Sequence, residues 1–74
     1  MERTIFDYSK LKGKIKEIYG TQSSFSSKLG LSTVSLSAKL NNDMDFRQEE
    51  IQKCVQLLGI QNNEIHSYFF CKSS

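Results

Sequence analysis

Four small side chains form the segment of this chain best suited to recognition chemistry: Thr33, Val34, Ser37 and Ala38. They recur at helical spacing on the side opposite Leu36 and Leu40, so we expect solvent to reach them in the free chain. Hydroxyl groups can bond many base edges, and small apolar groups can touch thymine methyls. A small, partly apolar surface of this kind also suits a protein partner. The segment therefore predicts noncovalent binding, either to DNA or to another protein.

Residues that serve catalysis or metal binding are scarce in these 74 residues. Cys54, Cys71 and the single histidine, His66, do not have the spacing of a zinc site. No nucleophile motif lies beside His66, which we expect at the surface. A chain this short buries roughly 60% of its unfolded surface, which leaves little room for a deep cleft. We therefore expect no enzyme activity, no metal and no cofactor.

The segment 21–40 predicts two short helices joined by a glycine turn. The first helix covers about residues 22–29 and the second about residues 33–40. Gly30 suits a helix end with positive φ, and Thr21 and Ser32 suit the two N-caps. Leu31 can then point back into the core. This arrangement matches a helix-turn-helix, whose second helix enters the DNA major groove, although any helical hairpin in a small bundle gives the same pattern.

Three further helices are expected around this pair, over about residues 8–19, 47–58 and 63–70. Apolar residues at helical spacing define their buried stripes: Leu11, Ile15, Ile18 and Tyr19 in the first; Ile51, Cys54, Val55 and Leu58 in the second; Ile65 and Phe69 in the third. Asp7 suits the first N-cap, and Met44 and Phe46 are expected to tuck into the core from a loop. The chain therefore reads as one all-α domain over 1–74, with its core at about 7–70 and short flexible termini.

Charge is spread unevenly along the chain, although its net value is only +2. Residues 1–40 hold seven basic and three acidic residues, whereas residues 41–74 hold three basic and five acidic ones. A basic half that contains the helix pair suits a phosphate-facing surface, and a merely solvated face is the alternative.

The expected cellular location follows from two features that the sequence lacks, a membrane span and a signal peptide. No run of about 18 apolar residues predicts a membrane span, and the N-terminus lacks the apolar stretch of a signal peptide. We therefore expect a cytoplasmic chain without a membrane partner. In that reducing compartment Cys54 serves as a small hydrophobe, and a disulfide with Cys71 is disfavoured.

The residues of the helix pair also resemble a known family. Thr21-Gln22, Phe25, Leu29-Gly30-Leu31-Ser32, Leu36 and Ser37 are similar to the lambda-repressor-like family of phage repressors and Cro proteins, and residues 51–60 and 63–65 fit its later helices. The resemblance covers about residues 7–70. Shorter segments look like a group of small phage regulators from Gram-positive hosts: 6–11, 40–42, 45–46 and 68–70.

Two positions depart from that family pattern. Ser26 stands where an alanine is usual, and it is small enough for close helix packing. Lys39 stands where the family more often has the second core residue of the recognition helix, and the next apolar residue is Leu40. We therefore expect the C-terminal end of that helix to be rotated or frayed.

The resemblance implies a five-helix, lambda-repressor-like fold that binds double-stranded operator DNA as a homodimer in a bacterial host, at the nucleoid. Helix 33–40 would lie in the major groove, with base contacts from Thr33, Val34, Ser37 and Ala38. Six residues are phosphate candidates: Gln22, Ser23, Lys28, Lys39, Asn41 and Asn42. Tyr68 and Phe70 are candidates for the dimer contact.

An alternative function follows from the composition of the reading face. It has no arginine, asparagine or glutamine, which supply most of the strong bidentate base contacts. Such a face suits a phage modulator or antirepressor that binds a partner repressor protein through the surface of the helices at 22–29 and 33–40. Val34 would then belong to a protein interface.

Overall fold

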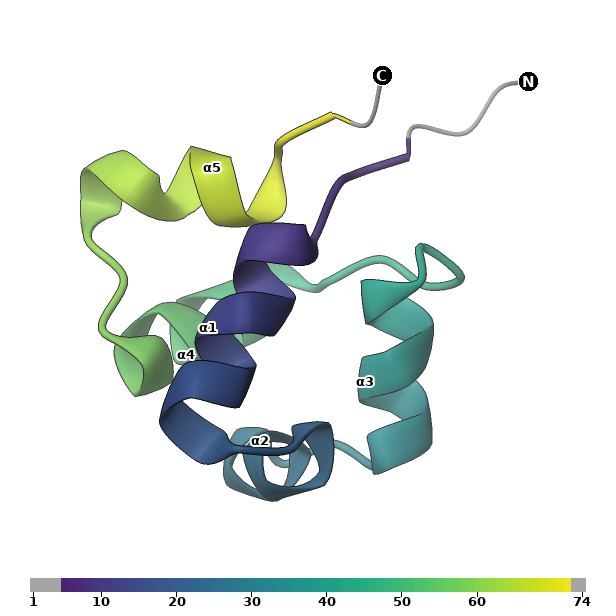
Figure 1. The fold of residues 1–74 in the computed structure, drawn as a ribbon. Helices are drawn as coiled ribbons and strands as arrows, with labels where there is room; N and C mark the ends of the chain where they lie inside the picture. The colour runs from purple at the N-terminus through teal and green to yellow at the C-terminus, as the bar shows by residue number, and fades with distance from the viewer. Residues whose placement is uncertain (1–4, 73–74) are drawn as a thin grey trace.

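Five α-helices enclose one apolar core in the computed structural model, which describes residues 5–72 (Figure 1). They are α1 (Ser9–Tyr19), α2 (Gln22–Leu29), α3 (Thr33–Leu40), α4 (Gln48–Leu58) and α5 (Ile65–Phe69), with a 3-10 turn, η1 (Asn62–Glu64), before α5. The predicted all-α fold with five helices is confirmed. The last helix is shorter than expected because its first turn is of the 3-10 type.

The core is built from the predicted stripes, with two exceptions. Its largest fully buried side chains are Phe25, Phe69, Leu11, Ile15, Leu36 and Cys54. Ile18 and Tyr19 were both expected inside, but only Tyr19 packs against the core, with its ring 5.2 Å from that of Phe25 between centroids, whereas Ile18 is exposed. Met44 is also exposed, whereas Phe46 packs against the core as expected.

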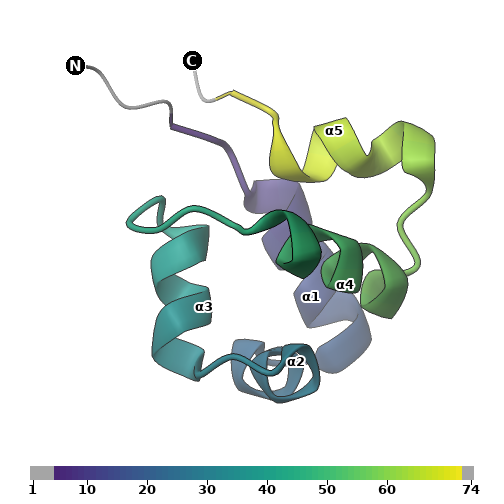
Figure 2. The same ribbon diagram turned by 180° about the vertical axis from the view of Figure 1, so that it is seen from behind.

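Local hydrogen bonds explain why α2 and α3 begin and end where they do. Thr21 and Ser32 each cap a helix, accepting from the backbone N–H of Ser24 and Ser35 at 3.1 Å. Gly30 ends α2 with φ at 84°. These caps and this turn agree with the sequence prediction, and they place α3 along one side of the molecule, with α2 at its N-terminal end (Figure 2).

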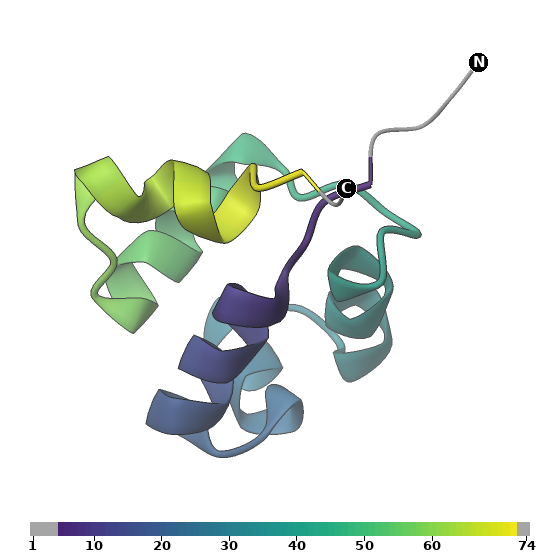
Figure 3. The ribbon, with the colours of Figure 1, turned by 45° about the horizontal axis from the view of Figure 1, so that its top comes forward.

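The first and last described residues lie side by side (Figure 3). Phe6 and Lys72 form an isolated antiparallel bridge, and the backbone N–H of Asp7 donates to the carbonyl of Cys71 at 2.7 Å. The expected flexible termini fall partly on residues 1–4 and 73–74, outside the described residues. Among the helices of residues 5–72, none has the length and apolar character needed to cross a bilayer.

Candidate interaction face on α3

The outer side of α3 is an exposed and largely uncharged face. Val34 is 79% exposed, Thr33 is exposed, and Ser37 and Ala38 are partly exposed. With two residues from the following turn they line an open groove of about 430 Å³: Asn41 and Asp43. The four residues predicted to read a partner therefore do share one accessible surface, which we call the outer face of α3.

The predicted phosphate contacts on α2 lie outside this groove. Ser23 and Lys28 are exposed, whereas Gln22 is only partly exposed. Gln22 lines a separate hollow of about 180 Å³ beside Lys12 and Lys16 of α1. The expected base contacts thus share the outer face of α3, whereas Gln22 lies in a separate basic hollow at the junction of α1 and α2, and Ser23 and Lys28 line neither.

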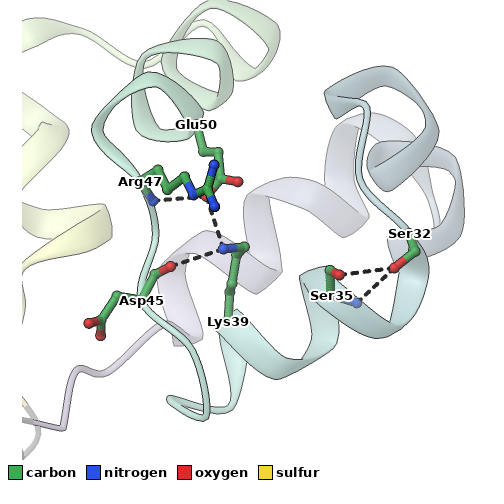
Figure 4. A network of polar contacts seen from close by, with 6 residues as sticks. All are labelled: Ser32, Ser35, Lys39, Asp45, Arg47 and Glu50. Carbon is green, nitrogen blue, oxygen red and sulfur yellow. Dashed lines mark hydrogen bonds and ion pairs between the residues drawn. The ribbon is translucent and has the colours of Figure 1, made fainter.

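Lys39 requires a correction, because it is not available to a phosphate. Its side chain is buried on the inner side of α3, where its Nζ lies 3.0 Å from Oε1 of Glu50 and donates to the carbonyl of Asp45 at 2.9 Å (Figure 4). The ammonium therefore already has partners within the chain.

The C-terminal end of α3 is neither frayed nor rotated outward. The helix is continuous to its last residue, and both Lys39 and Leu40 are buried. A long aliphatic stem lets the lysine occupy a core position while its charged end reaches a carboxylate. The expectation drawn from the family's usual core residue was therefore wrong.

Asn42 requires the second correction. Its backbone adopts a positive φ of 66°, a conformation that asparagine tolerates after a helix end, but its side chain is occupied. Oδ1 accepts from the N–H of Phe6 at 3.0 Å, and Nδ2 donates to the carbonyl of Phe6 at 2.9 Å. This amide joins the end of α3 to the N-terminal segment, so it is not free for a phosphate, whereas Asn41 is exposed.

The two aromatic residues expected in a dimer contact divide into one buried and one exposed side chain. Tyr68 was expected in an interface but is only 6% exposed, because α5 turns its ring onto the core, with the ammonium of Lys10 4.7 Å from the ring centroid. Phe70 is 40% exposed and contacts Phe6 edge-on. Only Phe70 therefore stays accessible as expected.

The pKa values of two groups near the inner side of α3, Glu50 and Cys54, are shifted by their surroundings. Burial alone would raise the pKa of Glu50, but hydrogen bonds from the Arg47 N–H and the Lys39 ammonium, with their positive charges, outweigh it and lower this pKa below its ordinary value. Burial, aided by the charge of Glu50, raises the pKa of the free thiol of Cys54 to about 12. The Glu50 carboxylate is thus held ionised, and Cys54 stays protonated at neutral pH.

Two residues of this region were missed at the level of sequence. Asp43 enters the groove because its backbone N–H donates to the carbonyl of Ala38 at 2.8 Å, which folds the chain back over the end of α3. The Asn41-Asn42 helix ending was the available signal. Glu50 follows Arg47 at the spacing of a capping box, and its carboxylate accepts from the Arg47 N–H at 2.8 Å.

Within residues 5–72 no group of three or more acidic, histidine or cysteine residues is placed to hold a metal.

Comparison with known proteins identifies a family and a similar solved structure. Residues 4–72 match the family described as "Protein of unknown function (DUF739)". The solution structure of the modulator of repression (MOR) of the temperate bacteriophage TP901-1 from Lactococcus lactis shares 43% identity, covers 88% of each chain and superposes with a TM-score of 0.77. No curated protein gives a significant match. The expected likeness to small phage regulators is confirmed, whereas membership of the lambda-repressor-like family stays a prediction.

Proposed function

The chain belongs to the DUF739 family of proteins of unknown function, and from this premise we propose that it modulates repression by binding a partner repressor protein through the surface of α2 and α3. The likeness to a phage modulator of repression supports this reading over the alternative of an autonomous operator-binding repressor. The partner would be a phage repressor, and a longer, divergent reading frame beside this one would supply the protein to test.

The observation that carries the proposal is the charge of the outer face of α3. Among residues 5–72, Asp43 is the only charged residue that lines its groove, and the one lysine of α3 is buried in an ion pair. DNA binding draws much of its affinity from cations set against phosphates, and a carboxylate in the groove opposes it. A protein surface has no such requirement.

The apolar content of the same face supports a protein partner as well. Val34 stands out from α3, and Met44 is exposed just after it, with its N–H donating to the carbonyl of Ala38 at 3.3 Å. Exposed apolar side chains surrounded by hydroxyl groups resemble the centre and rim of a protein interface. Val34 is therefore the side chain we expect at the centre of the contact.

Direct binding to operator DNA is the second candidate function, and one observation favours it. Lys12 and Lys16 flank the hollow that holds Gln22 at the start of α2, which is suitable chemistry for a backbone phosphate. In this reading Thr33, Val34, Ser37 and Ala38 would face base edges in the major groove, and a homodimer would match a symmetric operator.

Binding assays at several salt concentrations separate the two functions. We expect the purified chain to form a saturable complex with the neighbouring repressor, measured by calorimetry, and to leave its own promoter DNA unshifted in a gel. Replacing Lys12 and Lys16 together with alanine should leave the repressor complex unchanged. Absence of a complex with the repressor would refute the proposal. A DNA complex whose log affinity falls linearly with log salt would establish the second candidate instead.

A further inference from the structure

The inner side of α3 is held by a charged contact where an apolar one would be expected. Lys39 is 3% exposed, and its side chain reaches from α3 across to the segment that precedes α4. There the ammonium meets Oε1 of Glu50 at 3.0 Å and the carbonyl of Asp45 at 2.9 Å, so two elements are fixed by one group (Figure 4).

Glu50 is itself fixed before it meets Lys39. The same Oε1 accepts from the N–H of Arg47 at 2.8 Å, in the first turn of α4. This hydrogen bond restricts the Glu50 carboxylate to one position, in which it meets the Lys39 ammonium. The lysine end of the contact therefore has a fixed target on α4.

The geometry of the helix connects this contact to the outer face. Lys39 follows Val34 by five positions, which places the two residues about 140° apart around the helix axis. Leu36 and Leu40 also face inward, but apolar contacts have no preferred direction. An ion pair with a hydrogen bond to a fixed carbonyl is directional, so it adds a constraint on the rotation of the helix that the leucines do not supply.

We propose that Lys39 and Glu50 are the positioning pair that sets the rotation of α3, and with it the direction in which Val34 and its neighbours face a partner. The part of this inference that concerns binding rests on the proposed function. Buried ion pairs add little net stability compared with apolar residues of equal size, and their best attested use is to select one arrangement among several. A role in position rather than in stability fits a helix whose outer face binds.

Replacing the lysine by an apolar residue of similar length tests the pair. Lys39→Met keeps the stem and removes the ammonium, and Glu50→Gln keeps the shape of its partner and removes the charge. Lys14→Met is the matched control, because it deletes a surface ion pair with Glu17 at 3.7 Å on α1. Each variant is first shown to be folded by circular dichroism, and Glu50→Gln serves as the milder variant if Lys39→Met does not fold.

Residual dipolar couplings of the free protein measure the orientation of α3 against the other helices. We expect Lys39→Met and Glu50→Gln to change the couplings of α3 while those of α1, α2 and α4 still fit the structure. The double variant should be no worse than Lys39→Met alone, because both changes remove one interaction. Unchanged couplings of α3 in a folded Lys39→Met variant would overturn the proposal.

Affinity for the repressor gives the second readout. We expect Lys39→Met to weaken binding by at least about tenfold, and the Lys14→Met control to stay within about twofold. Unchanged affinity in Lys39→Met would overturn the role of the pair in binding. If the wild-type chain does not bind the repressor, the proposed function fails, and the dipolar couplings still decide whether the pair positions α3.

Discussion

The two sides of α3 differ in what their residues contact. On the inner side Leu36, Lys39 and Leu40 are buried, and each has a partner in the core or on α4. On the outer side Val34 and Thr33 are exposed to solvent, and Asp43 is the one charged residue that lines their groove among residues 5–72. One helix therefore combines a side that packs against the rest of the fold with a side that is exposed to solvent.

The eight residues of α3 therefore serve two purposes, packing on one side of the helix and exposure to solvent on the other. Changes on the inner side should affect stability or the orientation of the helix, whereas changes on the outer side should affect binding and leave stability unchanged. Variants on the two sides that change stability and binding to the same extent would contradict this distinction.

The largest expected effect on stability comes from truncating a buried side chain on the inner side of α3. Leu36→Ala should lower the free energy of unfolding by about 3 kcal/mol, since Leu36 is fully buried and the cavity cannot be refilled. Val34→Ala should change it by less than about 0.5 kcal/mol, because its side chain contacts solvent. Urea denaturation of the two variants measures both values. Equal losses would show that the sides of α3 are not distinct.

A smaller effect is expected where the end of α3 meets the N-terminal segment. Asn42→Ala removes two hydrogen bonds to the backbone of Phe6 and strains a positive φ, so the free energy of unfolding should fall by about 1–2 kcal/mol. Asn42→Gly is the control that keeps the backbone conformation without the amide. If Asn42→Gly is as stable as the wild type, the bonds to Phe6 do not anchor the helix.

The sequence was sufficient for features determined within a few residues. Thr21, Gly30 and Ser32 have the roles predicted for them because a cap or a turn depends on local hydrogen bonds and φ. The all-α fold followed from apolar spacing in the same way. The position of the outer face was also predictable, since it lies opposite the buried Leu36.

Features that depend on distant partners were not predictable in this way. Lysine is rarely buried without a partner, and nothing near Lys39 in the sequence identifies Glu50 as that partner. Ile18 and Tyr19 are both apolar enough for the stripe of α1, and the tyrosine is held by distant partners, the ring of Phe25 and the carbonyl of Leu57. Tyr68 is buried through its contact with the core under α5, which the local pattern does not specify.

The pH dependence of stability tests the contribution of the Glu50 charge on the inner side, with a smaller expected effect on the free energy of unfolding. The pKa of Glu50 is lowered in the folded chain, so its contribution to stability is present above the ordinary pKa of a glutamate, roughly 4.3, and is lost as the pH falls through the lower folded value. The stability difference between wild type and Glu50→Gln should therefore shrink between about pH 6 and pH 3. Urea denaturation across this range measures it, and a constant difference would show that the carboxylate charge does not contribute.

The most direct test of the outer face is an NMR titration of the ¹⁵N-labelled chain with the unlabelled neighbouring repressor. The account predicts that amide signals of Thr33, Val34, Ser37 and Ala38 shift or broaden first, and that those around the exposed Phe70 stay in place. Val34→Asp should abolish these changes, whereas Ile18→Asp, an exposed aliphatic position on α1, should preserve them. Perturbations centred on Phe70 with α3 unaffected would contradict the account.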